Sequence, residues 1–424
     1  MQSLRTLIEQ NRAGAPVAIP SVCSAHPEVL VASLLLARSL GRRLLVEATS
    51  NQVNQFGGYT RMEPADFIAF VHHLADDHDV PREMIDFGGD HLGPQAWRDE
   101  PADMAMAKAA DLVRAYVTAG FTKIHLDCSE GCAGEAGQVG DAVAAARAAE
   151  LAAVCEDAAL DGRAISYVVG TEVPSPGGVR AEEGDHDIAP TDPDAARATI
   201  TTHRDAFTAR GLEAAWSRVA GLVVQPGLEF GATEVFPFPM DSPNRLSAAL
   251  ADTPGLCFEA HSTDYQAPAV FPELARRNFA ILKVGPALTF AYRQAVYALA
   301  AIDGWLHPTA DGPHLPAVME RLMTADPGYW QRHYAGDGEA LRLQRHFAYA
   351  DRIRYYWAQP AAREAVTALM ARLTGPRPLP PLLEQYVEPV VLDRADGLIG
   401  DRIGWARAIV LAQVQGALAP YFFF

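Results

Sequence analysis

The sequence is poor in three features that mark whole classes of protein. Only five of its 424 residues are cysteines, and none belongs to a Cys-x-x-Cys pair, so we expect neither a disulfide framework nor a clustered zinc site. Its 35 basic residues are outnumbered by 52 acidic ones, which argues against the basic surface of a nucleic-acid-binding protein. Its longest apolar stretches, such as VLVASLLLA at 29–37, fall short of the ~20 residues that a membrane-spanning helix needs. Because the N-terminal stretch also reads as an amphipathic helix rather than a secretion signal, we expect a cytoplasmic protein.

From residue 17 to about residue 300, short apolar runs alternate with longer helical patterns. The helical patterns, such as 64–76, 101–120 and 143–159, place apolar residues three and four positions apart. Eight apolar runs predict strands, at 17–23, 44–50, 85–91, 123–129, 165–172, 222–229, 256–262 and 279–286. Alternating strands and helices imply parallel strands joined by right-handed crossovers, and eight such units predict a (β/α)8 TIM barrel. A doubly wound open sheet is the alternative, which the lack of a Gly-x-Gly-x-x-Gly turn after the first strand disfavours.

The alternation of predicted strands and helices stops near residue 305. Residues 1–304 are therefore predicted to form the barrel with its active-site cavity, and residues 305–424 a helical extension packed on it. The motif RIRYYW at 352–357 is expected to belong to the packing face of that extension. An acidic stretch at 180–196 predicts a long loop after the fifth strand, a candidate lid.

Residues that can carry out chemistry gather at the predicted strand ends, where TIM barrels place their active sites. In chain order they are Glu47, Asn51, Gln52, Asp90, His91, His125, Asp127, Glu172, Glu229, His261, Asp264 and Lys283. Two imidazoles and a carboxylate facing one cavity suit a divalent transition metal with open coordination positions. We predict His91, Glu229 and His261 as ligands. For any one histidine, a hydrogen-bonded position in the core is the alternative. For His125, which alternates with Asp127, the alternatives are a place beside the metal ligands or simple packing.

Two carboxylates are candidates for proton transfer, Asp90 and Glu172. Neighbouring strand residues point to opposite sides, so Asp90 is predicted not to share the metal with His91. The glycines at 88, 89 and 93 allow a kinked strand end that turns Asp90 toward the substrate. Its alternative role is to cap the following helix. Lys283 could form a Schiff base, but such a site has no use for a histidine pair, and an ion pair with Glu172 or Glu259 is the alternative. Glu47, Asn51, Gln52, Asp127 and Asp264, together with Lys283, are predicted to bind the substrate.

Seven long motifs resemble the Z subunit family of D-tagatose-1,6-bisphosphate aldolase (GatZ/KbaZ), a distant relative of class II aldolases. They are EATSNQVNQFGGYT (47–60), GGDHLGP (88–94), KIHLDCSEGCAGE (123–135), GTEVPSPGG (170–178), VVQPGLEFG (223–231), FEAHSTDYQ (258–266) and ILKVGPALTFA (281–291), and DRIRYYW (351–357) extends the match. The resemblance implies that Asp90 and His91 correspond to the aldolase proton donor and metal ligand. It also implies that His261 is a metal ligand and that Glu229 falls near the position of the remaining one.

The chain departs from the class II aldolase pattern in two places. Glu229 stands where an imidazole is expected, and Ser262-Thr263-Asp264-Tyr265-Gln266 replaces a glycine-rich phosphate loop. An aspartate in that loop repels a phosphate dianion and suits sugar hydroxyls better. Some members of this family are labelled tagatose-6-phosphate kinases, but the sequence contains no Walker A motif, so we reject a kinase.

The resemblance implies a metal-dependent epimerase acting at C4 of a ketohexose or its phosphate, of the fructose and tagatose type. The expected mechanism is retro-aldol cleavage of the C3–C4 bond followed by re-addition to the other face of the aldehyde. Zn, Mn, Ni or Co would chelate the C2 and C3 oxygens, and Asp90 or Glu172 would handle the C4 hydroxyl proton. The alternative is a non-catalytic subunit that stabilises an aldolase catalytic subunit. A homo-oligomer is also expected.

Overall fold

A closed barrel of eight parallel strands forms the centre of the computed structural model, which describes residues 3–159, 162–171, 188–308 and 314–423. Around the barrel the strands follow the order β1-β10-β9-β6-β5-β4-β3-β2. Their bounds are β1 (Ile19–Cys23), β2 (Leu44–Thr49), β3 (Ile85–Leu92), β4 (Lys123–Leu126), β5 (Ser166–Val169), β6 (Val219–Val223), β9 (Cys257–Ala260) and β10 (Phe279–Val284). The predicted TIM barrel is confirmed.

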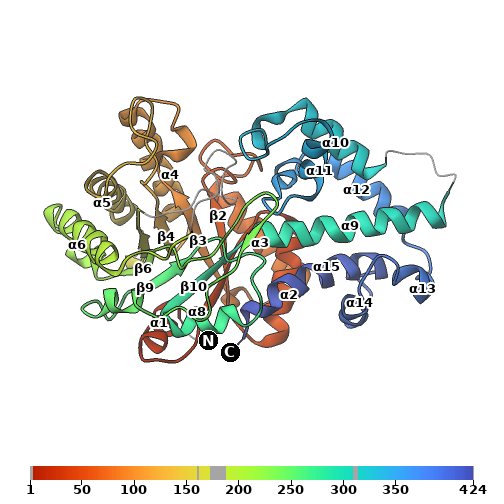
Figure 1. Ribbon diagram of the computed structural model, residues 1–424, viewed down its shortest axis with the longest axis horizontal. Coiled ribbons are helices and arrows are strands. Elements are labelled where there is room, and N and C mark those ends of the chain that lie inside the picture. The colour runs from red at the N-terminus through yellow and green to blue at the C-terminus, as the bar shows by residue number, and fades with distance from the viewer. Residues whose placement is uncertain (1–2, 160–161, 172–187, 309–313, 424) are drawn as a thin grey trace.

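Helices surround this barrel, as Figure 1 shows. They are α1 (Leu4–Arg12), α2 (Pro27–Leu40), α3 (Pro64–Asp77), α4 (Ala102–Ala119), α5 (Asp141–Ala158), α6 (Pro193–Ala209), α7 (Glu213–Trp216), α8 (Val270–Arg276) and α9 (Pro286–Leu306), with short 3-10 turns at Arg82–Met84, Pro94–Trp97 and Leu246–Leu250. Several begin with proline in the first turn, where its missing N–H is not needed. A reciprocal capping box between Glu63 and Asp66 starts α3.

The strands of a parallel barrel are buried on both faces, so their sequences are almost continuously apolar. A few polar residues interrupt these runs, and their side chains point into the barrel. Glu47, Lys123, Glu259 and Lys283 are such residues, and all four are buried. Gly88 lies between Glu47 and Lys123 in the strand register. A Cβ atom at Gly88 would come within 2.6 Å of the Glu47 Oε1 atom. The missing side chain therefore makes room for the Glu47 carboxylate to reach across β3 to Lys123.

The sixth predicted strand, at 222–229, is misplaced, which is a correction, because β6 already begins at Val219. β6 ends at Val223, and Pro226 interrupts the run because it cannot donate to a strand ladder. The Gln225 side chain then accepts hydrogen bonds from the backbone N–H groups of Gly227 and Leu228 and closes a turn. Glu229 consequently belongs to a separate two-stranded hairpin of β7 (Glu229–Phe230) and β8 (Val235–Phe236), not to the end of a barrel strand.

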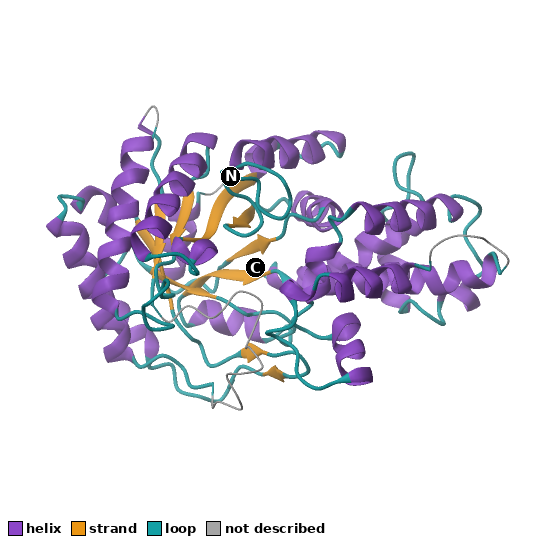
Figure 2. Ribbon diagram, turned by 90° about the horizontal axis from the view of Figure 1, so that it is seen from above, coloured by secondary structure: helices purple, strands orange, loops and turns teal. Residues whose placement is uncertain are grey.

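The C-terminal part is helical and projects from one side of the barrel (Figure 2). It contains α10 (Leu315–Ala325), α11 (Gly338–Phe347), α12 (Pro360–Arg372), α13 (Pro380–Leu383), α14 (Pro389–Asp396) and α15 (Trp405–Leu418), with 3-10 turns at Pro327–Tyr329, Arg352–Tyr356 and Ala419–Tyr421. α15 packs against α2 and α9, and the Tyr421 hydroxyl donates to the Thr263 carbonyl in the loop after β9. In the part of the chain that the structure describes, no helix is long and apolar enough to cross a membrane.

Candidate metal and active site

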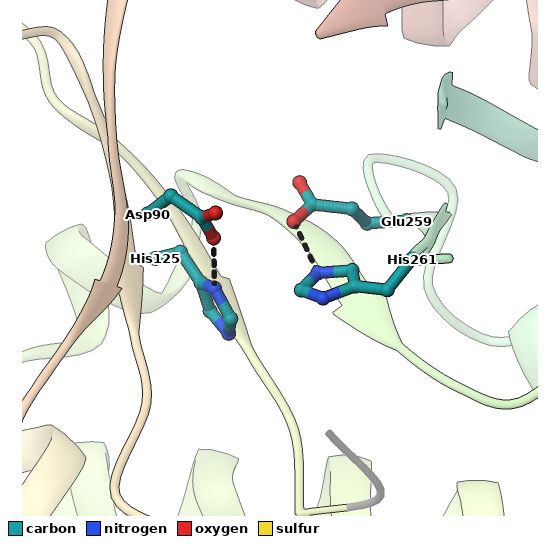
Figure 3. A group of neighbouring side chains, drawn as sticks. All are labelled: Asp90, His125, Glu259 and His261. Atoms are coloured by element: carbon teal, nitrogen blue, oxygen red, sulfur yellow. Dashed lines mark hydrogen bonds and ion pairs between the residues drawn. The ribbon is translucent and has the colours of Figure 1, made fainter. Parts of the chain in front are cut away.

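Four buried side chains meet inside the barrel and offer a set of metal-binding atoms. They are Asp90 from β3, His125 from β4, Glu259 from β9 and His261 directly after β9. One ligand atom of each lies within 4.8 Å of the ligand atoms of the others. Figure 3 shows the Asp90 carboxylate against His125 and the Glu259 carboxylate against His261, with the two pairs facing each other.

His91 completes a triangle of imidazoles with His125 and His261. Their ring centroids are 5.1 Å (His91–His125), 5.0 Å (His91–His261) and 5.3 Å (His125–His261) apart. His91 reaches this position because its φ angle is +48°, a left-handed conformation that is strained for a side-chain-bearing residue. Asp90 and His91 therefore both line the cavity. Neighbours on a regular strand would point to opposite sides, and the expectation that they do so here is wrong, because the left-handed conformation of His91 turns both into the cavity.

Each of these imidazoles also contacts a carboxylate. His91 Nδ1 lies 2.7 Å from Asp127 Oδ2, His125 Nδ1 lies 3.2 Å from Asp90 Oδ1, and His261 Nε2 lies 2.9 Å from Glu259 Oε1. Carboxylate partners of this kind fix the orientation and tautomer of metal-binding histidines. Asp127, predicted to bind substrate, thus holds His91, and its other oxygen accepts from the Ser129 N–H and hydroxyl.

A layer of buried ion pairs lies next to the four-residue cluster. The Lys123 ammonium is 2.5 Å from Glu47 Oε1 and 2.6 Å from Glu259 Oε2. Lys283 pairs with Glu47 at 2.9 Å and with Asp90. Glu47, Asp90, Asp127 and Glu259 outnumber these two ammonium groups, so the charge balance of the site favours an added cation.

The burial and charge of the site shift its pKa values. Burial, together with the positive charge of Lys283, lowers the pKa of His261 to about 3, which keeps its imidazole in the neutral form that binds metals. Burial alone would raise the pKa of Asp90, but His91 and Lys283 hold it well below its usual range. Asp90 therefore stays ionised.

The chemistry of these residues fits a divalent transition metal. Imidazole nitrogens combined with carboxylate oxygens are the donors that Zn, Mn, Ni and Co accept. In addition, the Nε2 atom of His125 is buried and lacks a hydrogen-bond partner among the described residues. A buried polar atom in that condition is costly unless a further group satisfies it.

The structure brings most of the predicted site residues to one cavity. Its lining includes Asn51, Gln52, Asp90, His91, His261, Asp264 and Lys283. Glu229 is buried in β7, where its carboxylate accepts from the Phe230 N–H, and it is not among the four clustered residues. Glu172 and residues 180–187 of the predicted lid lie outside the described residues, and α6 already begins at Pro193, within the range predicted as a loop.

Asp264 occupies an unexpected position in this cavity. Its Oδ1 atom accepts hydrogen bonds from the backbone N–H groups of Gly285, at 3.1 Å, and Ala287, at 2.8 Å. These groups form the N-terminus of α9, so Asp264 acts as a helix cap. Burial raises its pKa to about 6, which leaves the carboxylate mainly ionised at neutral pH.

Several residues of the site were missing from the predicted set. Lys123 and Glu259 belong to the buried charge layer, and Arg354 and Tyr355 line the cavity from the C-terminal extension. Residues two positions apart on a strand lie on the same face. Lys123 precedes His125 by two residues and Glu259 precedes His261 by two, so this spacing could have predicted that both enter the site. RIRYYW was expected only to pack; Arg352, Ile353 and Tyr356 are indeed buried, whereas Arg354 and Tyr355 face the cavity.

Comparison with known proteins places the chain in a family. The family model described as D-tagatose-1,6-bisphosphate aldolase subunit GatZ/KbaZ-like matches residues 4–423. The chain belongs to this GatZ/KbaZ-like family. The resemblance seen in the sequence motifs is confirmed.

Three relatives of this GatZ/KbaZ-like chain are informative. A D-tagatose 6-phosphate 4-epimerase from Agrobacterium fabrum is 48% identical over 420 residues, which are 99% of this chain and 97% of that protein. The crystal structure of a probable tagatose 6-phosphate kinase from Sinorhizobium meliloti 1021 is 46% identical with a TM-score of 0.86, covering 96% of this chain and 99% of that one. The glycerol complex of fructuronate-tagaturonate epimerase from Cohnella laeviribosi shares the fold at 12% identity and a TM-score of 0.52, covering 96% and 81% of the two chains.

The names of the first two relatives describe different reactions. The GatZ/KbaZ-like chain has no Walker A motif anywhere in its sequence, and a nucleotide-dependent kinase of the P-loop type needs one to hold the phosphates of ATP. The epimerase name of the 48% identical relative, in contrast, agrees with the activity expected from the sequence.

Proposed function

We propose that the chain interconverts ketohexose 6-phosphates of the tagatose and fructose type by inverting C4, with a divalent transition metal as cofactor. The observation that carries the proposal is the buried cluster of Asp90, His125, Glu259 and His261. It occurs in a chain that is 48% identical to a D-tagatose 6-phosphate 4-epimerase along nearly its full length.

Of the four clustered residues, His125, His261 and Glu259 would hold the ion, which leaves Asp90 for the substrate. His91, whose ring centroid lies 5.0 Å from that of His261, is the further ligand predicted from the sequence. When bound there, a divalent cation supplies Lewis-acid stabilisation of the negative charge that develops at the carbonyl end of the sugar. Asp127 and Glu259 keep His91 and His261 in orientation through the contacts described above. Glu229, the ligand predicted from sequence, lies in the β7–β8 hairpin and is not needed for this set.

The carbons of the substrate determine the kind of reaction. C4 of a 2-ketose is not adjacent to the carbonyl carbon, so enolisation cannot invert it. Cleavage of the C3–C4 bond turns C4 into a planar aldehyde carbon, and re-addition to its opposite face yields the epimer. A group that removes the C4 hydroxyl proton and returns it is required on the protein.

Asp90 is the described residue best placed to handle that proton. It lines the cavity beside His261, and the ammonium group of Lys283, which forms an ion pair with it, favours its ionised form. Lys283 pairs with both Asp90 and Glu47 and thereby positions the acceptor. Glu172 remains the second candidate predicted from sequence.

Removal and restoration of metal test the proposal. Chelator-treated protein, without any partner subunit, is expected to leave D-tagatose 6-phosphate unchanged, and addition of Zn²⁺, Mn²⁺, Ni²⁺ or Co²⁺ is expected to restore formation of D-fructose 6-phosphate. Product can be followed by ¹³C NMR. A folded protein that forms no C4 epimer with any of these metals would contradict the proposal and favour the non-catalytic aldolase subunit instead.

A further inference from the structure

The proposed substrate carries a phosphate group, and the barrel lacks its usual place for one. TIM barrels commonly bind phosphate with the loops after the last two strands and a helix N-terminus beside them. Here the N–H groups of Gly285 and Ala287 at the start of α9 already donate to the buried Asp264 carboxylate. A phosphate at this position would meet a negative charge, so the phosphate must bind elsewhere in the cavity.

Among the described side chains that line the cavity, Arg354 is a positively charged group that can still bind an anion. It comes from the Arg352–Tyr356 turn of the C-terminal extension and lines the cavity together with Asp90, His261 and Lys283. Lys283 is already paired with Glu47 and Asp90. Arg354, in contrast, forms no ion pair with a carboxylate of the described residues; its hydrogen bonds go to the carbonyls of Ala350 and Asp351 and to the Tyr355 hydroxyl.

These hydrogen bonds to neutral groups hold the guanidinium in place. The carboxylates of Asp264 and Asp351 interact with its charge through space, without forming an ion pair with it. Nη1 donates to the Ala350 carbonyl at 2.5 Å and Nη2 to the Tyr355 hydroxyl at 3.1 Å, while the guanidinium carbon lies 4.6 Å from the centre of the Tyr355 ring. A fixed, half-buried guanidinium with spare N–H groups is the side chain best suited to grip a phosphate.

Arg354 lies where two cavities meet. Arg354 and Gln52 line both the cavity of the metal-binding cluster and a neighbouring cavity of about 430 Å³. A sugar with its carbonyl end at the cluster can therefore extend its other end toward the boundary between the two cavities, where Arg354 lies.

We propose that Arg354 binds the phosphate group of the substrate, so that the C-terminal extension supplies the residue that selects a phosphorylated sugar. This inference rests on the proposed function for the identity of the sugar, but the anion site itself can be tested separately. Asp264 disfavours a phosphate at the start of α9. A phosphate bound by Arg354 lies at a different place in the cavity, so a sugar phosphate can still be the substrate.

The test compares the metal-loaded wild-type chain with Arg354→Gln, Arg354→Lys and the control Arg363→Gln. Arg363 is exposed and lines only the neighbouring cavity. Two quantities are measured: KM for D-tagatose 6-phosphate, and the binding of inorganic phosphate by calorimetry. We expect Arg354→Gln to raise KM and weaken phosphate binding roughly 10- to 100-fold, the effect of losing charge-assisted hydrogen bonds. Arg354→Lys should be intermediate because lysine keeps the charge but not the fork of donors, and Arg363→Gln should match the wild type.

The two readouts separate the failure of this inference from that of the proposed function. If the wild type shows no turnover but binds phosphate in a way that Arg354→Gln abolishes, the anion site stands and the proposed reaction fails. If Arg354→Gln and Arg354→Lys, folded by circular dichroism, keep the wild-type KM or the wild-type phosphate affinity, the inference is overturned. A large effect of Arg363→Gln in place of Arg354→Gln would also overturn it, since the phosphate would then lie in the neighbouring cavity.

Discussion

Replacement of His261 with alanine is expected to lower kcat/KM for D-tagatose 6-phosphate by more than about 100-fold. Loss of a residue that merely supports a metal ligand costs roughly 10- to 100-fold, and a direct ligand should cost more. The imidazole of His261 lies within the 4.8 Å cluster and faces both His91 and His125. The same variant is expected to lose bound metal, measured by elemental analysis after dialysis.

His73→Ala is the matched control for this substitution. His73 lies on α3, its side chain is 73% exposed, and its contact is a surface pair with Asp77. Its removal should leave activity and metal content unchanged. A folded His261→Ala protein that retains activity within tenfold of the wild type would exclude His261 as a ligand.

Replacement of Lys123 with methionine is expected to destabilise the protein by about 3–5 kcal/mol, because removing one partner of a buried ion pair leaves its counter-charge unpaired. Lys123 contacts Glu47 at 2.5 Å and Glu259 at 2.6 Å, and all three side chains are buried. Methionine has a similar volume, so packing changes little. The free energy of unfolding is measured by urea titration.

The partly exposed pair Lys108–Glu100 is the control for Lys123. Its shortest contact is also 2.5 Å, but the side chains are 30% and 35% exposed, and pairs of that kind contribute roughly 0–1 kcal/mol. Lys108→Met should therefore change stability by less than about 1 kcal/mol. Equal effects of the two substitutions would show that burial does not set the strength of the Lys123 contacts.

The loss caused by Lys123→Met should shrink as the pH falls. Burial raises the pKa of Glu259, but Lys123 and Lys283 more than offset this and hold it well below its usual value. A carboxyl group with a lowered pKa in the folded state stabilises the protein above its unfolded pKa and loses this contribution in acid. Without Lys123 the pKa of Glu259 rises, so protonation relieves the unpaired charge at lower pH.

The barrel could be predicted from the sequence because the same pattern, an apolar run followed by a helical segment, is repeated eight times. Each parallel strand is buried on both faces and therefore appears as an apolar run. Seven predicted runs cover their strands to within one residue, whereas the sixth, at 222–229, shares only Leu222 and Val223 with β6. There, Pro226 and the Gln225 turn separate Glu229 from β6, and the apolar pattern alone does not register that break. The misplacement of one strand end also led to the prediction of Glu229 as a metal ligand.

The site could be predicted only in part, for reasons that differ between residues. Asp90, His261 and Lys283 follow from the rule that strand ends carry the chemistry. The inward direction of His91 depends on a φ of +48°. The glycines at 88, 89 and 93 indicate a kinked strand end, but not which of the neighbouring side chains it turns inward. Arg354 reaches the cavity through the folding of an extension that begins after the barrel, and its place depends on tertiary packing that spacing in the sequence does not encode.

The most direct test of the account is to locate the metal in the protein. Crystals of the active, Mn²⁺- or Zn²⁺-loaded protein would be measured at the absorption edge of the metal, and the anomalous difference map would show where the ion binds. The account predicts one strong peak inside the barrel, in contact with His261 and with the neighbouring side chains of Asp90, His91, His125 or Glu259. A peak at another place in the chain, or active crystals with no peak in the barrel, would contradict it.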